Sequence, residues 1–199
     1  MVSCFRGMLE CLQGPSYSVA PSYHHLQELP CVKLDTTRVG SDVVVVKNGH
    51  RICGTGAALA NAPIVQNKAY FEVKLQQAGI WGIGLALKNI DLNRLPLGDS
   101  HGGSWVLRQD GQLCTNGESV AILDPLPEEG DVLGVAFDHI DMKLFKNGQP
   151  LSVSISGIKG PVYPVLYVDD GAILDVQFTA FWHDPPTGFE EIMLEQTIL

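Results

Sequence analysis

The sequence has no run of basic residues, and no apolar stretch in it approaches the roughly 18 residues of a membrane-spanning helix. Proteins that bind nucleic acid use Lys and Arg to displace counterions from the phosphates. This chain instead has 22 acidic and 13 basic residues, which give a formal net charge of −9. Nucleic acid is therefore a poor candidate partner, and stable insertion into a membrane is not expected. An anionic membrane surface would repel most of the chain.

Closely spaced cysteine pairs are also missing. The five cysteines are widely spaced and odd in number: Cys4, Cys11, Cys31, Cys53 and Cys114. Zinc sites use close cysteine pairs and secreted domains use paired disulfides, so we expect neither a metal nor a disulfide framework. The first fourteen residues are interrupted by Arg6 and Glu10 and lack the apolar core of a signal peptide. We expect a reducing compartment, the cytoplasm, with access to the nucleus.

The N-terminal segment leaves two interpretations open. If residues 1–13 were helical, Cys4 and Cys11 would share one face with other apolar residues. One interpretation makes these two cysteines S-acylation sites on a weak membrane tether. The other is an apolar leader that packs loosely or not at all. Myristoylation is not expected, because Val2 stands where a glycine would be required.

Turn-forming residues divide the chain into three parts. Gly and Pro among Ser, Tyr and His indicate a linker up to residue 30, so we expect residues 1–30 to be a partly disordered leader and linker. Residues 31–190 form the predicted folded domain, and residues 191–199 are a tail that either forms a short helix or adds a strand. Within the domain, Asn-Gly and Asp-Gly pairs predict tight hairpin turns, because these residues tolerate positive φ. The five pairs are residues 48–49, 110–111, 116–117, 147–148 and 170–171.

The segments between these turns have the two-residue period of β-strands. In residues 70–75, apolar side chains alternate with Glu72 and Lys74, which we expect to face water. We expect Asp175 on the polar side of a similar strand. Residues 43–46 are a continuous valine run, typical of a buried strand. Since the domain lacks a long helical pattern free of Gly and Pro, the sequence predicts an all-β fold with antiparallel strands, a sandwich or a barrel.

Patterns that indicate catalysis are weak. A glycoside hydrolase needs two carboxyl groups about 5–10 Å apart, one as acid and the other as base or nucleophile. The clearest strands carry only Glu72 and Asp175, each expected to face water. A Gly-x-Gly at residues 54–56 lacks the third small residue and the helix of a dinucleotide site. We expect no enzymatic activity; a carbohydrate-binding or glycoside-hydrolysing β-sandwich is the alternative.

Four segments stand in an order that resembles the SPRY domain. They are Tyr-Phe-Glu-Val at 70–73 with Gly-Ile-Trp-Gly-Ile-Gly at 79–84, Ser-Trp-Val-Leu-Arg at 104–108, Gly-Asp-Val-Leu-Gly-Val-Ala-Phe-Asp at 130–138, and Val-Tyr-Pro-Val at 162–165. The resemblance extends over residues 32–190. It implies a two-sheet antiparallel β-sandwich of the concanavalin-like jelly-roll type, which binds protein or peptide partners through its loops and uses no cofactor.

Two pairs of residues in these segments have expected roles that do not depend on the resemblance. Trp81 and Trp105 are large enough to fill the space between two sheets. Gly82 and Gly84 lie on the same face of a strand, where the lack of a side chain lets an aromatic ring or a backbone approach closely. We expect these four residues to build the sandwich.

By position, the resemblance implies a partner-binding surface on three loop regions. They contribute Arg51 from the turn at 49–51, Leu95, Pro96 and Leu97 from the segment 88–103, and Tyr167, Asp169 and Asp170 from the segment 167–171. The apolar residues of the middle loop either anchor a partner or fold back over a sheet edge. The two aspartates either meet a basic partner or simply face water. We expect a non-enzymatic adaptor or scaffold, monomeric by default, that recognises a protein or peptide.

Overall fold

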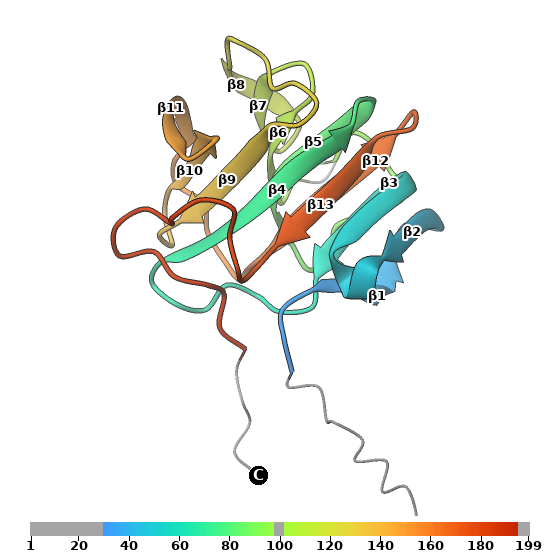
Figure 1. Ribbon diagram of the computed structural model, residues 1–199, viewed down its shortest axis with the longest axis horizontal. Coiled ribbons are helices and arrows are strands. Elements are labelled where there is room, and N and C mark those ends of the chain that lie inside the picture. Colours follow the sequence, from blue (N-terminus) through green and yellow to red (C-terminus); the bar gives the residue numbers. More distant parts are fainter. Residues whose placement is uncertain (1–29, 98–101, 195–199) are drawn as a thin grey trace, which may run out of the picture.

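The computed structural model describes residues 30–97 and 102–194, which form two facing antiparallel β-sheets (Figure 1). The predicted all-β fold class is confirmed. Helical structure in this part of the chain is one short 3-10 turn, η1 (Lys47–Gly49). The strands are β1 (Leu34–Val39), β2 (Asp42–Val46), β3 (Arg51–Ala60), β4 (Ala69–Gln77), β5 (Ile80–Leu87), β6 (Ser104–Arg108), β7 (Gln112–Thr115), β8 (Glu118–Ile122), β9 (Val132–Phe137), β10 (Met142–Lys146), β11 (Gln149–Ile155), β12 (Val162–Asp169) and β13 (Ile173–Gln177).

Strand β3 belongs to both sheets. The first sheet has the order β11-β10-β9-β4-β13-β3-β2, and the second has the order β1-β3-β12-β5-β6-β7-β8. Arg51 and Ile52 pair with β13 in the first sheet, whereas residues 56–59 pair with β12 in the second. Between them, Gly54 has a φ of 93°, and a Cβ there would lie 2.2 Å from the carbonyl oxygen of Asp42. Glycine therefore allows the strand to pass from one layer to the other.

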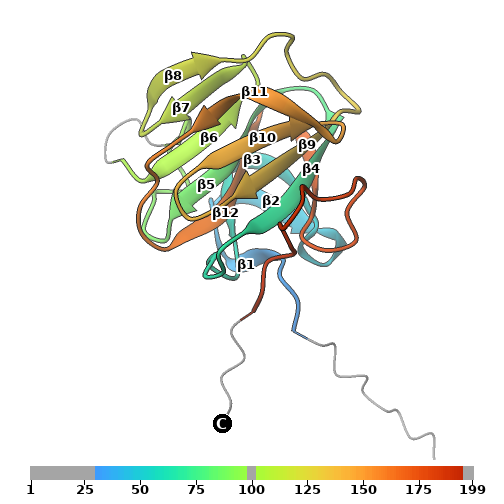
Figure 2. The same cartoon turned by 90° about the vertical axis from the view of Figure 1, so that its left-hand side faces the viewer.

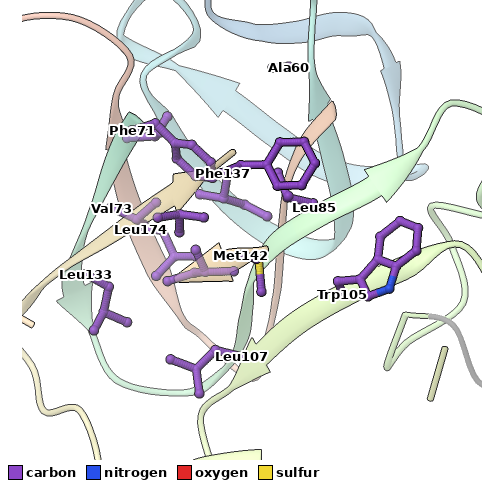
Figure 3. Packing of buried hydrophobic residues seen from close by; sticks show 14 of the residues in the cluster. Ala60, Phe71, Val73, Leu85, Trp105, Leu107, Leu133, Phe137, Met142 and Leu174 are labelled. Carbon is purple, nitrogen blue, oxygen red and sulfur yellow. The ribbon is translucent and has the colours of Figure 1, made fainter. Parts of the chain in front are cut away.

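The main core fills the space between the two sheets, whose strands Figure 2 shows in a view turned by 90°. Alternation works as predicted on β4, where Phe71, Val73 and Leu75 are buried against the opposite sheet. Trp81 and Trp105 belong to the same cluster, at 3% and 8% exposure, so their predicted space-filling role is confirmed. Figure 3 shows side chains of the first sheet, including Phe71, Val73, Leu133 and Phe137, across the interior from Leu85, Trp105 and Leu107 of the second sheet.

Four of the five predicted turn dipeptides connect directly paired strands. These connections are β2–β3, β6–β7, β7–β8 and β10–β11. The fifth pair, Asp170 and Gly171, also turns the chain, with φ angles of 48° and 78°. It joins β12 of the second sheet to β13 of the first, however, and these two strands are not neighbours. The prediction of a hairpin at this position was wrong, because the turn passes the chain between the two layers.

Glu72 and Asp175 do not face water, which corrects the sequence prediction. Glu72 is fully buried and Asp175 is 8% exposed. The segment that follows β13, residues 178–192, returns over the face of β4 that points away from the core, and a bridge pairs Glu190 with Ala69. Burial against this segment and the neighbouring Glu72 carboxylate raise the pKa of Tyr70. The polar face of β4 is therefore covered by a later part of the chain.

Residues 43–46 also differ from their prediction. Strand β2 pairs with β3 and lies at the edge of the first sheet. Val44 and Val46 are 51% and 41% exposed, whereas Val43 and Val45, which alternate with them, are half-buried. Val43 and Val45 pack against the main core, and Val44 and Val46 point to the opposite, exposed face, so the valine run is half-buried and not fully buried.

Candidate partner-binding site

The ring of Tyr167 is the floor of the candidate site. In the second sheet, β5 lies between β12 and β6, and Gly82 pairs with Tyr167 on one side and with Arg108 on the other. A Cβ on Gly82 would lie 2.0 Å from Cε1 of Tyr167. The predicted close approach of an aromatic ring to this glycine is confirmed, and it directs the Tyr167 ring toward Arg108.

The segment from Lys88 to Leu97 covers the outer face of the second sheet. The backbone amide of Ala57 on β3 donates to the carbonyl oxygen of Leu92 at 2.9 Å, and the Ser104 hydroxyl donates to that of Leu97 at 3.2 Å. Apolar side chains of the segment pack in a second cluster around Tyr167, which also contains Tyr163 and Val165. Leu97 is 1% exposed. The interpretation that this loop folds back is therefore correct for Leu97, although the loop covers a sheet face and not an edge.

A cavity of about 170 Å³ remains between this loop and the end of β12. We call it the loop–turn pocket. It is lined by Ile80, Leu95, Pro96, Arg108, Gln109, Tyr167 and Asp169. Leu95 and Pro96 are half-buried. Two of the three loop regions predicted from the resemblance, the middle loop and the β12–β13 turn, thus meet in one concave site.

Two polar atoms of the pocket residues are buried without a hydrogen-bond partner among the described residues. They are the Nε donor of Arg108 and the Oε1 acceptor of Gln109. Burial lowers the pKa of Arg108, but the nearby Tyr167, Asp110 and Cys114 outweigh this effect and raise it, so the guanidinium stays charged. An unsatisfied buried polar group costs about 1–3 kcal/mol, which a ligand with matching groups would recover.

The turn after β12 is fixed in place on one side and exposed on the other. The Thr55 hydroxyl on β3 donates to the Asp169 carboxylate at 2.9 Å, and the backbone amide of Asp170 donates to the same oxygen at 2.8 Å. Asp170 and Gly171 are exposed. Asp169 is therefore held against β3 at the wall of the pocket, while Asp170 is free to meet solvent or a partner.

Arg51 lies away from the loop–turn pocket. Its Nε and Nη2 atoms donate to the two carboxylate oxygens of Asp175 at 2.5 and 2.8 Å, and Lys47 contacts the same carboxylate at 3.0 Å. Burial would raise the pKa of Asp175, but the hydrogen bonds from Arg51 and Lys47 lower it below its ordinary value. Arg51 thus holds a buried carboxylate on the first sheet, and it does not line the pocket.

Comparison with known proteins identifies the architecture. The model of the SPRY domain family matches residues 68–181, which include β4 to β13 and both walls of the pocket. The chain belongs to the SPRY domain family. SPRY domain-containing protein 7 of Gallus gallus is 56% identical to it over 176 residues, which cover 87% of this chain and 89% of that protein.

Two more distant similarities fit the same SPRY assignment. Ran-binding protein 9 of Xenopus laevis is 31% identical over 115 residues, which are 55% of this chain and 21% of that protein. The crystal structure of the SPRY domain of human HERC1 superposes with a TM-score of 0.61 at 16% identity, and covers 72% of this chain and 96% of that one. At this identity the structural similarity shows the fold alone.

Sequence reasoning missed three residues of the SPRY domain's pocket: Ile80, Arg108 and Gln109. The available signal was the position of Arg108 at the end of a strand next to the Asp110–Gly111 turn. The sequence gives no cross-strand register, however, and only the register through Gly82 brings Arg108 to Tyr167.

Some of the residues named in the sequence predictions are not described by the structure. Cys4 and Cys11, and with them the acylation hypothesis, lie outside the described residues, as do residues 98–101 of the middle loop. In the described part of the chain, no group of three or more His, Cys, Asp and Glu side chains is placed to hold a metal ion. Within the same ranges, no helix has the length and hydrophobicity needed to span a bilayer.

Proposed function

We propose that this SPRY domain is a non-enzymatic interaction module that binds a segment of a partner protein in the loop–turn pocket. The observation that carries the proposal is the pair of buried, unpartnered polar atoms on Arg108 and Gln109 beside an apolar wall of Leu95 and Pro96. A small concave site with an apolar lining and a few convergent polar groups is the usual form of a specific binding site.

Family membership supports the same function. SPRY domains are typically protein-interaction modules, and one relative, Ran-binding protein 9, is named for its binding to a protein. An adaptor or scaffold role follows if the bound segment belongs to a protein whose position or activity the domain controls. The domain is proposed to act as a monomer in the cytoplasm, with access to the nucleus.

The alternative, glycoside hydrolysis, has little support. The two carboxylates considered for it are both engaged: Glu72 is fully buried and accepts hydrogen bonds from Tyr70, Trp182 and His183. Asp175 is bound by two cations. The two carboxyl groups of a catalytic pair must flank the glycosidic bond that is cleaved. Neither Glu72 nor Asp175 is accessible to such a substrate.

Affinity capture from cells with a site variant and a matched control tests the proposal. The site variant is Leu95→Ala with Asp170→Ala, which removes one aliphatic wall and the exposed acid of the turn. The control is Ile140→Ala with Asp124→Ala, because Ile140 is 61% exposed, Asp124 is also exposed, and neither residue lines the pocket. Each variant is compared with the wild type by quantitative mass spectrometry of captured proteins and by thermal unfolding.

We expect the site variant to lose at least one protein that the wild type and the control variant both retain, with melting temperatures equal within a few degrees. Equal recovery of every captured protein by the site variant would remove the loop–turn pocket from the binding surface. A glycan array provides the second arm, since strong carbohydrate binding without a protein partner would favour the alternative function.

A further inference from the structure

A second, larger cavity lies next to the loop–turn pocket. Its volume is about 330 Å³, and it is lined by Leu75, Ala78, Gly79, Trp81, Gln109, Pro127, Glu128 and Glu129. We call it the acidic pocket. Gln109 lines both cavities, and the consecutive residues Gly79 and Ile80 each line one of them. The two cavities therefore form adjacent parts of one surface that crosses the turn between β4 and β5.

The floor of the acidic pocket is apolar and its rim is negative. Trp81 and Leu75 belong to the main core, and Pro127 is also buried. Glu128 and Glu129 are exposed at the rim. Such a combination suits the side chain of Lys or Arg, whose methylene stem packs on apolar surface while its cation reaches carboxylates.

The rim is held in position by hydrogen bonds to β4. The backbone amide of Gly130 donates to the carbonyl oxygen of Leu75 at 2.7 Å, and the amide of Leu75 donates to that of Asp131 at 2.9 Å. Glu129 accepts a hydrogen bond from the backbone amide of Ala78 at 3.2 Å. The acidic groups are thus preorganised, which lowers the entropic cost of binding a cation.

The charge of Lys146 does not neutralise the rim. Lys146 is 2.7 Å from Asp131 and donates to the carbonyl oxygen of Leu126, so its charge is already paired. The Glu128 carboxylate accepts no hydrogen bond from the described residues. The two pockets are lined by three carboxylates, those of Glu128, Glu129 and Asp169, and by one guanidinium, that of Arg108. The Arg108 guanidinium lies 3.7 Å from the Asp110 carboxylate.

The unpartnered atoms indicate what the rest of the ligand offers. Arg108 lacks an acceptor for its Nε, and Gln109 lacks a donor for its Oε1. These are consecutive residues of the chain. An extended peptide backbone presents both a carbonyl oxygen and an N–H at each residue, so it supplies the missing acceptor and donor together.

We propose that the two pockets together bind an extended, basic segment of a partner protein. A Lys or Arg of that segment enters the acidic pocket, where its stem contacts Trp81 and its cation meets Glu128 and Glu129. The backbone of the segment continues past Gln109 to Arg108 in the loop–turn pocket. This inference rests on the proposed function and adds the charge and conformation of the ligand to it.

Selection from a displayed library of random linear peptides on the immobilised full chain tests the inference. Enriched peptides are then synthesised with a fluorophore, and their dissociation constants are measured by fluorescence polarisation. The site variant is Glu128→Gln with Glu129→Gln, which keeps side-chain size and leaves an oxygen at position 129 to accept the hydrogen bond from the Ala78 amide. The matched control is Glu190→Gln with Glu191→Gln, because these two are also adjacent and exposed but line neither pocket.

We expect Lys or Arg to be enriched at one position of the selected peptides. The site variant should weaken their binding by about tenfold, as should replacement of that residue by norleucine, whereas the control should change it by less than about twofold. The loss of affinity caused by the site variant and the loss caused by norleucine in the peptide should not be additive, since both changes remove the same contact. Higher salt should weaken binding to the wild type and have less effect on the site variant.

The two possible failures are distinguishable. Peptides that lack an enriched basic residue, or that bind the site variant as tightly as the wild type, overturn the inference; the proposed function then stands if Leu95→Ala with Asp170→Ala weakens them. Absence of any enriched peptide counts against the proposed function and the inference together.

Discussion

The carboxylate of Glu72 accepts a hydrogen bond of 2.5 Å from the backbone amide of Trp182, a residue 110 positions later in the chain. The same side chain also accepts from the Tyr70 hydroxyl at 3.0 Å and lies 3.1 Å from Nδ1 of His183. One fully buried carboxylate therefore holds the segment that follows the last strand against β4.

Removal of this acceptor should strongly destabilise the domain. Glu72→Ala leaves the buried Tyr70 hydroxyl and the part-buried donors of Trp182 and His183 unpaired, and we expect it to lower the free energy of unfolding by about 3 kcal/mol or more. Glu72→Gln should cost less, because one oxygen remains. Urea denaturation measures both, with Glu118→Ala on exposed β8 as the control. A loss of less than about 1 kcal/mol for Glu72→Ala would show that the segment is held by other contacts.

Asp175 should make stability depend on acidity. Its pKa is depressed in the folded state, because the hydrogen bonds from Arg51 and Lys47 outweigh burial. The stabilisation it provides is therefore fully present above the unfolded value of about 3.8 and is lost as the pH falls through the lower folded value. Asp175→Asn should cost about 1–3 kcal/mol near neutral pH, with a smaller difference from the wild type near pH 3.

Urea denaturation at several pH values measures that difference, and Asp42→Asn at an exposed position serves as the control. If the difference in free energy of unfolding between the wild type and Asp175→Asn stayed constant from neutral to acidic pH, the ion pair would not be the source of the variant's lower stability.

Gly82 should tolerate no side chain while Tyr167 is present. A Cβ at this position would overlap the Tyr167 ring, so we expect Gly82→Ala to cost about 1–3 kcal/mol through overpacking. The same change in a Tyr167→Leu background should cost clearly less, because the smaller side chain can move away. Thermal and urea unfolding of the four proteins in this double-mutant cycle give the coupling energy. Additive costs would mean that the ring and the glycine do not constrain each other.

Leu95 and Leu97 should separate binding from stability. Leu97 is fully buried in the second cluster, so Leu97→Ala should lower the free energy of unfolding by about 2–5 kcal/mol. Leu95 is half-buried and lines the pocket, so Leu95→Ala should reduce peptide affinity with a smaller stability loss. Urea denaturation and fluorescence polarisation with the selected peptides measure the two effects, and equal stability losses would contradict this division of roles.

The sequence predicts the sandwich well because its strongest signals are local. Alternation of Phe71, Val73 and Leu75 with polar residues depends only on neighbours two positions apart. Its prediction for Glu72 failed because the covering segment comes from residues 178–192, which no local pattern connects to β4. Polar identity alone does not distinguish a residue exposed to water from one that accepts hydrogen bonds from a distant part of the chain.

The candidate site was predicted in part for the same reason. Position within the family pattern indicated Leu95, Pro96 and Asp169, and these residues do line one pocket. Arg51 was indicated in the same way, yet it pairs with Asp175 on the other sheet. Arg108 lies in the site because of the strand register, which depends on the pairing of β5 with β6 and β12. Register over such separations is a property of the whole fold.

The placement of β12 and β13 has a consequence for synthesis of the protein. These strands, made last, lie in the middle of both sheets: β12 joins β3 to β5, and β13 joins β3 to β4. A nascent chain that ends before Val162 therefore consists of separate groups of strands with open edges. These groups are joined into the two complete sheets only after β12 and β13 have been synthesised. Until then, chaperones are the natural protection of those edges against aggregation.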